Sequence, residues 1–366
     1  MRVLTNLKDR TKFKFNQNEG KMKIKEAILI GLVLLLMVSL TLPLGCTKAP
    51  DTVTFPDENL EAAVRAALGK PAGEEITTEE LAELTTLGAE SKSSGIADIS
   101  GLEYCINLTW LGLWETQISD ISPLTNLTNL TVLYFLESQI SDVSPLSNLT
   151  NLTVLGLGGS QISDISPLSN LTSLTLLELR GNQISDISPL ANLTSLTELS
   201  LAKNQISDVS SLSSLTNLTW LYLDENEISD ISPLANLTNL TGLILRGNQI
   251  SDVSPLANLT NLIFSLNLWG NQISDISPLA NLTNLHQLRL SENQISDISP
   301  LANFTNLIEL RLSEHQISDI SPLVENSGLG GGDEVWLEKN NLDLWEGSED
   351  LENIRSLEAR GVVVHY

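Results

Sequence analysis

The chain has very little of the residue types that build metal sites and active sites. Only two cysteines, Cys46 and Cys105, and three histidines occur in 366 residues. The two cysteines cannot form a zinc-binding spacing, and His286, His315 and His365 accompany no nucleophile in a recognisable catalytic motif. The sequence also lacks a glycine-rich phosphate-binding loop. These absences predict a protein that is not an enzyme and that carries no metal or other cofactor.

Basic residues are also scarce after the first 45 positions. That leading segment has eight Lys or Arg and three acidic residues, which leaves 12 basic and 42 acidic residues for the rest of the chain. A surface with a formal charge near −30 would repel phosphate backbones. Nucleic acid is therefore not an expected partner.

The chain is instead rich in one repeat of 22 residues around the string Gln-Ile-Ser-Asp-Ile-Ser-Pro-Leu. The anchor isoleucines are Ile118, Ile140, Ile162, Ile184, Ile206, Ile228, Ile250, Ile273, Ile295 and Ile317. One interval is 23, because the stretch from Leu262 to Leu266 has an extra residue, and degenerate copies stand at Ile96 and Leu342. A period in this range is typical of a solenoid, in which each coil packs on its neighbours.

Each repeat contains the alternation of a short strand with one buried face. Leu199 and Leu201 have a period of two, while Glu198, Ser200 and Ala202 point to the other side. Successive strands are expected to stack about 4.8 Å apart into one parallel sheet on the concave face of a curved, right-handed coil. The fold class predicted is an α/β repeat solenoid.

The rest of the repeat predicts the return path. A Ser-Pro pair, as at Ser188 and Pro189, favours a short 3₁₀ or α turn on the convex side, with the serine as its N-cap. After each strand comes a position where a buried amide can hydrogen-bond the backbone of neighbouring coils. Asn182, Asn204, Asn226, Asn248, Asn271, Asn293 and Asn340 hold this position, and Thr116, Ser138, Ser160 and His315 replace it in outer coils.

The pattern Leu-x-x-Leu-x-Leu-x-x-Asn-x-Ile is that of the leucine-rich repeat. With Ser-Asp-Ile-Ser-Pro-Leu-Ala-Asn-Leu-Thr after it, the unit resembles the repeat of bacterial internalins, and the segment from Phe55 to Arg65 resembles the start of their helical N-terminal cap. The resemblance implies that the concave sheet binds a protein partner, and some members of the family engage host receptors. No contact residue is carried over, because concave positions vary among members. Adhesion and an envelope scaffold fit equally.

Both ends of an open solenoid need polar-faced covers. At the front, Leu60, Val64 and Leu68 recur at helical spacing, and Thr77 with Glu80 forms a capping-box signature for a second helix. At the rear, a helix capped by Ser348 and a final strand over 362–364 are expected. The resulting organisation is a signal segment 1–45, a linker 46–54, a helical N-terminal cap 55–95, leucine-rich repeats 96–342 and a C-terminal cap 343–366.

The first segment has the order of a secretory signal. Lys21, Lys23 and Lys25 precede an apolar run over 27–42, and Met22 fits the true initiator. The run ends in Leu42-Pro43-Leu44-Gly45-Cys46, which resembles a bacterial lipobox except at Pro43. This resemblance implies a lipid anchor at Cys46 and an extracytoplasmic place at the bacterial cell surface. The alternative is an uncleaved membrane anchor, for which the run is slightly short.

Cys105 occupies a core position of the repeat and is interpreted as a buried hydrophobe.

Large aromatic residues concentrate at the outward strand positions. Seven of the eight Trp and Tyr between residues 101 and 340 lie six, four or two residues before the Asn position. Folding does not require exposed rings, and aromatic residues with arginine are enriched at protein-binding hot spots. The candidate ligand-binding residues are Trp110, Trp114, Tyr134, Trp220, Tyr222, Arg246, Trp269, Arg289, Arg311 and Trp336. We expect a monomer that binds a protein ligand with this face.

Other interpretations remain open at this point. Carbohydrate binding would have Trp110, Trp220 and Trp269 stack on sugar rings, with Asn267, Gln287 and Glu198 as hydrogen-bonding neighbours. A third resemblance, to repeats of a protein-phosphatase regulatory subunit, implies an intracellular setting that the signal segment argues against. A column of aspartates, one per coil from Asp98 to Asp319, suits either local turn capping or shared cations, and capping is favoured because no repeat offers enough oxygen ligands for Ca²⁺.

The lipid anchor generates a direct prediction. Cys46→Ala removes the only thiol that the lipobox resemblance makes available for acylation, so the protein is expected to move from membrane to soluble fractions. Fractionation followed by immunoblotting measures this. Unchanged partitioning would show that Cys46 does not anchor the protein.

Overall fold

The computed structural model describes residues 51–88 and 95–366. The expected signal segment 1–45, Met22 and Cys46 lie outside the described residues. Pro50–Tyr366 form one compact unit. Within the described ranges, no helix has both the length and the apolar character needed to cross a bilayer.

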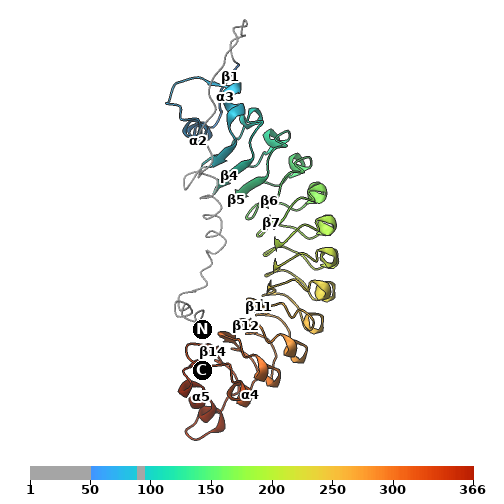
Figure 1. The fold of residues 1–366 in the computed structure, drawn as a ribbon, viewed down its shortest axis with the longest axis vertical. Coiled ribbons are helices and arrows are strands. Elements are labelled where there is room, and N and C mark those ends of the chain that lie inside the picture. The colour runs from blue at the N-terminus through green and yellow to red at the C-terminus, as the bar shows by residue number, and fades with distance from the viewer. Residues whose placement is uncertain (1–50, 89–94) are drawn as a thin grey trace, which may run out of the picture. The chain divides into compact units, whose positions relative to one another are not determined.

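One parallel sheet of 13 strands runs through this unit, and each strand pairs with the strands that precede and follow it in the sequence. In Figure 1 the strands line the inner side of the arc and the short helical turns its outer side. The leucine columns are in register, with Leu199 paired to Leu177 and Leu221. These features confirm the predicted leucine-rich-repeat solenoid. The strands are β3 Thr86–Gly88, β4 Trp110–Trp114, β5 Val132–Leu136, β6 Val154–Gly156, β7 Leu176–Glu178, β8 Glu198–Ser200, β9 Trp220–Tyr222, β10 Gly242–Ile244, β11 Ser265–Asn267, β12 Gln287–Arg289, β13 Glu309–Arg311, β14 Glu334–Trp336 and β15 Val363–His365.

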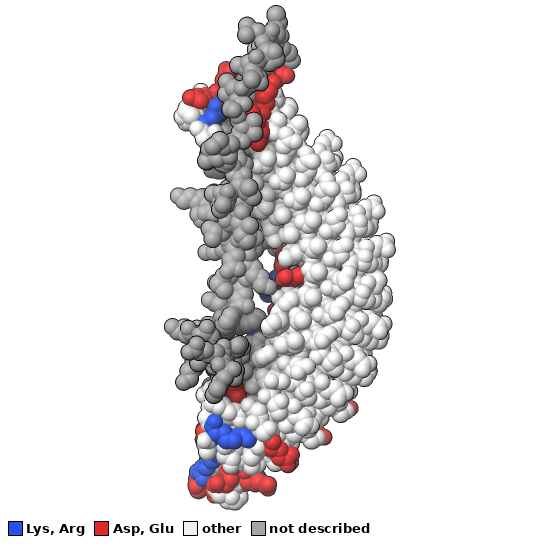
Figure 2. All heavy atoms as spheres, in the orientation of Figure 1, with Lys and Arg blue, Asp and Glu red and all other residues white. Residues whose placement is uncertain are grey.

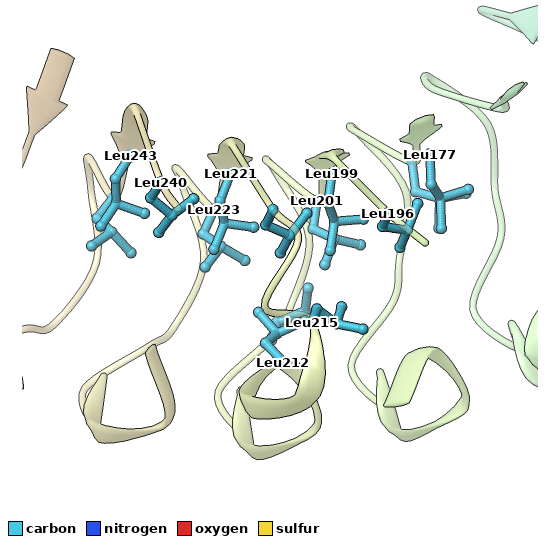
Figure 3. Close-up of a cluster of buried hydrophobic side chains, with 14 of the residues drawn as sticks. Leu177, Leu196, Leu199, Leu201, Leu212, Leu215, Leu221, Leu223, Leu240 and Leu243 are labelled. Carbon is cyan, nitrogen blue, oxygen red and sulfur yellow. The ribbon is translucent and has the colours of Figure 1, made fainter. Parts of the chain in front are cut away.

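The core is a continuous column of leucines and isoleucines between the sheet and the outer turns. Figure 3 shows leucines of neighbouring strands, including Leu199 and Leu221, pointing to the same side of the sheet, toward Leu212 and Leu215 of the outer path. All four are fully buried. Cys105 is buried in the same core, and burial raises the pKa of its thiol to about 12. Its interpretation as a core residue is confirmed.

The outer path is a series of short turns, most of which begin at a Ser-Pro pair. The expected serine N-cap is wrong: Ser188 is the first residue of its turn, and its backbone N–H donates 2.8 Å to Oδ1 of Asp186. The same bond recurs from Ser144 to Asp142, and hydrogen bonding to Ser144 lowers the pKa of that aspartate. The aspartate column thus caps turns, as expected. The turns are η1 Leu102–Tyr104, η2 Ser122–Leu124, η3 Ser144–Leu146, η4 Ser166–Asn170, η5 Ser188–Asn192, η6 Ser210–Ser214, η7 Ser232–Asn236, η8 Ser254–Leu256, η9 Ser277–Asn281, η10 Ser299–Asn303 and α4 Ser321–Glu325.

The asparagine column links each coil to the coils before it. The Nδ2 of Asn204 donates to the carbonyls of Leu179 and Leu201, at 3.1 and 3.0 Å, and its Oδ1 accepts from the Ile184 backbone N–H at 3.0 Å. All of these groups are buried, so each bond satisfies a polar group that has lost contact with water. The predicted role of the amide is confirmed.

Helices cover both ends of the core. At the front, α2 Glu58–Leu68 buries Leu60 and Val64, and α3 Thr78–Glu83 begins with the predicted capping box of Thr77 and Glu80. A small antiparallel pair joins β1 Thr52–Val53 to β2 Ile76–Thr77, so β1 lies within the expected linker. At the rear, α5 Glu349–Ala359 is capped by Ser348 and is followed by β15.

Stacking predicts a large effect for a single core truncation. Leu201→Ala is expected to lower the free energy of unfolding by about 2 to 5 kcal/mol, because a fully buried side chain is lost and a cavity remains between coils. Urea denaturation followed by circular dichroism measures it. Ser195→Ala, at an exposed position of the same coil, is the matched control and should change stability by about 0.5 kcal/mol or less. A near-zero effect of Leu201→Ala would contradict the observed register.

Candidate functional site

The candidate residues all lie on or directly after strands of the large sheet, at positions that alternate with the buried leucines. Trp110 and Trp114 stand on β4, and their neighbours Leu111 and Leu113 are buried. Trp220 and Tyr222 flank the buried Leu221 on β9 in the same way. Strand pleating therefore places the predicted aromatic residues on the face opposite the core.

The first group of rings, here called the front aromatic cluster, consists of Trp110, Trp114, Tyr134 and Leu136 on β4 and β5. The two indoles lie 6.0 Å apart between ring centroids and are tilted by 45°. Gly112 makes this arrangement possible, because a Cβ there would lie only 2.5 Å from the Trp110 ring and 2.7 Å from the Trp114 ring. Because glycine has no side chain, the two indole rings can occupy the space above Gly112.

The second group of rings, here called the rear aromatic cluster, centres on Trp220. Its indole stacks against Tyr222 and Phe264, with 5.8 Å between centroids in both cases, and covers Gly242. Phe264 was not predicted as a site residue, although its side chain is 53 % exposed. It stands in the coil with the 23-residue interval, so the break in the period was the sequence signal for it. Strands β6, β7 and β8 separate the two clusters.

The arginines contact aromatic rings and one shared carboxylate. Arg246 lies over the Trp269 ring at 5.1 Å, and Arg311 lies over the Trp336 ring at 4.2 Å, both within cation–π range. On its other side Trp336 stacks with His365 at 4.7 Å. These contacts fix the orientation of both indoles.

Glu309 is the shared carboxylate, and it bonds the side chains of both Arg289 and Arg311. It accepts a bidentate pair from Arg289 at 2.8 and 3.0 Å and a third bond from Arg311 at 2.6 Å. Burial alone would raise the pKa of Glu309, but the hydrogen bonds and charges of Arg289 and Arg311 outweigh it and lower the pKa. The sequence analysis did not identify Glu309, because its role depends on Arg289 of the preceding strand β12 as well as on Arg311 of its own strand β13.

Two of the candidate indoles line one pocket at the rear of the face. The pocket has a volume of about 470 Å³ and lies between Trp269 and Trp336. Its other lining residues are Ser291, Glu292, Arg311, Ser313, Glu314, Glu338 and Lys339. Among the residues that the structure describes, no group of three or more His, Cys, Asp and Glu is arranged to hold a metal ion.

A row of left-handed residues borders the face, directly before the asparagine column, and is here called the rim. Glycine holds the rim in four coils, at Gly159, Gly181, Gly247 and Gly270, whereas Glu115, Glu137, Lys203, Glu225, Glu292, Glu314 and Lys339 adopt φ between 54° and 63° in the others. A non-glycine residue in this conformation costs about 1 kcal/mol or more. The charged side chains are thus kept at sites that favour glycine, which suggests a use for the charge. In the sequence this position holds either glycine or a charged residue, and the sequence analysis did not use that pattern to identify the rim.

The Glu309 network predicts a pH-dependent contribution to stability. A lowered carboxyl pKa stabilises the folded state above the ordinary value of 4.5, and this contribution disappears as the pH falls through the lowered pKa. Glu309→Gln is therefore expected to melt at a lower temperature than the wild type at pH 7, with the difference shrinking below pH 4.5. Calorimetry across this range measures it. Glu334→Gln, at the exposed neighbouring position on β14, is the control, and an equal effect of both changes would exclude the network as the cause.

Comparison with known proteins supports the same fold. The family model for leucine-rich repeats (2 copies) matches nine overlapping stretches that run from residue 106 to residue 325. An internalin (inlF) of Listeria monocytogenes is 41% identical with a TM-score of 0.77, and the alignment covers 85% of this chain and 90% of that one. Internalin C2 (inlC2) of the same organism is 39% identical with a TM-score of 0.53, over 68% of this chain and 100% of that one.

More distant structures share the fold alone. A leucine-rich-repeat protein of Leptospira interrogans is 24% identical with a TM-score of 0.64, over 72% of this chain and 74% of that one. No curated protein matches the chain. The family model and the identity to the Listeria internalin over most of both chains agree with the repeat geometry described above. The chain belongs to the leucine-rich-repeat family and is an internalin-like protein.

Proposed function

We propose that this protein is a non-enzymatic binding protein of the bacterial cell surface, anchored by a lipid at Cys46, and that its concave face binds a protein partner. The observation that carries the proposal is the collection of seven Trp and Tyr side chains on one face of the sheet, at positions that the fold leaves free. Adhesion or a scaffold role in the envelope would use the face in the same way.

The packing of these rings supports a binding role. Trp110, Tyr134 and Trp220 each cover a glycine of a neighbouring strand, at Gly88, Gly156 and Gly242 respectively. The rings therefore lie along the sheet and present a broad apolar surface instead of projecting as isolated side chains. Aromatic rings held in place lose little conformational entropy when a partner covers them, and Trp, Tyr and Arg dominate protein hot spots.

Charged side chains accompany the aromatic residues at the inner edge of the repeats. Figure 2 shows a flank of the repeats with almost no charged side chains, whereas charges gather over the two capped ends and at the inner edge. The inner edge carries the rim residues, and some of them form ion pairs, such as Lys203–Glu225 at 3.3 Å and Lys339–Glu314 at 2.6 Å. Charged and aromatic groups on one surface favour a specific protein contact.

A carbohydrate ligand is the less favoured alternative. Stacking on a sugar needs an accessible ring face with polar groups beside it, but Arg246 already lies over Trp269. The side-chain oxygen of Asn267, proposed to bond a sugar, accepts from the Trp269 backbone N–H at 3.1 Å. Trp269 and Asn267, two of the groups that would recognise a sugar, thus have partners within the protein.

The proposal is tested by capture of a partner from the surface proteins of a cell that carries or meets this protein, followed by mass spectrometry. The double change Trp220→Ala with Arg246→Ala is expected to lose the captured partner while the melting temperature stays unchanged, because neither side chain belongs to the leucine core. Asn236→Ala with Asn258→Ala, on the convex side, is the matched control and should retain it.

Two results would contradict the proposal. Retention of the partner by the concave variant with loss by the convex one would place binding on the other face. A signal for the intact protein on a glycan array, with no protein captured, would favour the carbohydrate alternative.

A further inference from the structure

A histidine occupies one position of the asparagine column. His315 stands between Asn293 and Asn340, at the position where those coils enclose an amide. Its side chain is as well enclosed as theirs, with the residue only 6 % exposed. The junction between the coil of β12 and the coil of β13 is therefore built differently from the junctions on either side of it.

The neighbouring junctions show what the column position requires. Asn293 donates from Nδ2 to the carbonyl of Leu268 in an earlier coil at 2.9 Å, and its Oδ1 accepts from the Ile273 N–H at 2.9 Å. Asn340 donates to the preceding coil in the same way, and its Oδ1 accepts from the Ile317 N–H at 3.2 Å. Each junction thus uses one donor and one acceptor of the column residue to join two coils.

Both of these bonds are missing where the histidine stands. Among the described residues, neither ring nitrogen of His315 has a hydrogen-bond partner, and the N–H of Ile295, which corresponds to those of Ile273 and Ile317, has no acceptor. A neutral imidazole still carries one donor and one acceptor, but an imidazolium carries two donors and no acceptor. Protonation would therefore bury a charge and a surplus donor in a junction whose N–H already lacks a partner.

The surroundings of His315 oppose this protonation in the folded state. Burial is the main cause and lowers the pKa of His315 below its ordinary value of 6.5, although the backbone of Asn293 and Leu290 partly offsets the effect. The unfolded chain takes up the proton near pH 6.5, whereas the folded state takes it up only at lower pH. Stability contributed by the neutral form is thus lost as the pH falls from 6.5 toward the lowered pKa.

The charged groups nearest to the junction lie at the concave face and at the outer turns. Arg289 and Glu309 pair across the junction at 2.8 Å, and the lowered pKa of Glu309 keeps this pair ionised below pH 4.5. Asp297 and Asp319 cap the outer turns of the two coils. The rim residues directly before the column positions are Glu292, Glu314 and Lys339, and all three line the pocket between Trp269 and Trp336.

We propose that His315 makes this junction a pH-sensitive joint, whose protonation in mild acid loosens the packing of the β13 coil on the β12 coil and so the walls of the pocket. The pocket spans the joint, because Trp269 lies before it and Trp336 after it. If the concave face binds a protein partner as proposed above, the partner is held more tightly at neutral pH than in mild acid. That consequence rests on the proposed function, whereas the joint itself does not.

His315→Asn restores the column residue of the neighbouring coils and tests the joint directly. Hydrogen exchange of the full chain, followed by mass spectrometry at pH 7.5 and 5.5 and corrected for the intrinsic effect of pH, measures the opening of peptides that contain Ile295. In the wild type, opening is expected to increase severalfold toward acid, with about tenfold as the limit for one proton of ordinary pKa 6.5 over this range. The variant should lose this increase.

His286→Asn is the matched control, because it removes an imidazole of the β12 coil that lies outside the column and contacts the Ile263 carbonyl at 2.7 Å. It should keep the increase in opening toward acid. An equal increase in the wild type and in His315→Asn, or its loss in His286→Asn, would overturn the inference.

Capture of the partner at both pH values separates the joint from the proposed function. Weaker capture at pH 5.5 by the wild type but not by His315→Asn would support the role of the joint in release. Equal capture at both pH values, with an acid-sensitive joint, would overturn that role and leave the proposed function standing. Failure to capture any partner at either pH would remove the proposed function and leave the joint unaffected.

Discussion

Every coil of this protein buries its leucines only by stacking on the coils beside it. A single repeat has too little surface to enclose its own core, so the free energy of the fold comes from contacts between neighbours. This constraint fixes the inward strand positions as leucine and the turn positions as Asp, Ser and Pro. It also requires the buried amide that ties each coil to earlier ones, and the helices α2 and α5 that cover the two ends.

The same constraint determines where the protein can vary without loss of the fold. Outward strand positions and the rim contribute nothing to the leucine columns, so their residues are free to serve another purpose. Here they carry rings laid over glycines, arginines laid over rings, and charged residues in a left-handed conformation. Such features add little to the leucine columns or oppose local preference, and the proposed partner contact would use them.

The concave face is also divided into two halves with different chemistry. In the rear half, Arg246 lies over Trp269 and Arg311 over Trp336, and Glu309 holds Arg289 and Arg311 in place. In the front half, Trp110 and the neighbouring rim glutamates have no such cation from the described residues.

The sequence by itself determined the repeat, the register of the sheet, the caps and the face on which the aromatic residues lie, because each of these follows from a short pattern repeated at a constant step. It assigned turn capping to the serine as well as to the aspartate, since both residues suit that role in isolation, and the structure shows the aspartate in that role. Only the tertiary structure decided which side chains meet across coils. Phe264 against Trp220, Arg311 over Trp336 and Arg289 on Glu309 join residues of different coils. Their contacts depend on rotamers and on the space that neighbouring coils leave, which no single repeat encodes.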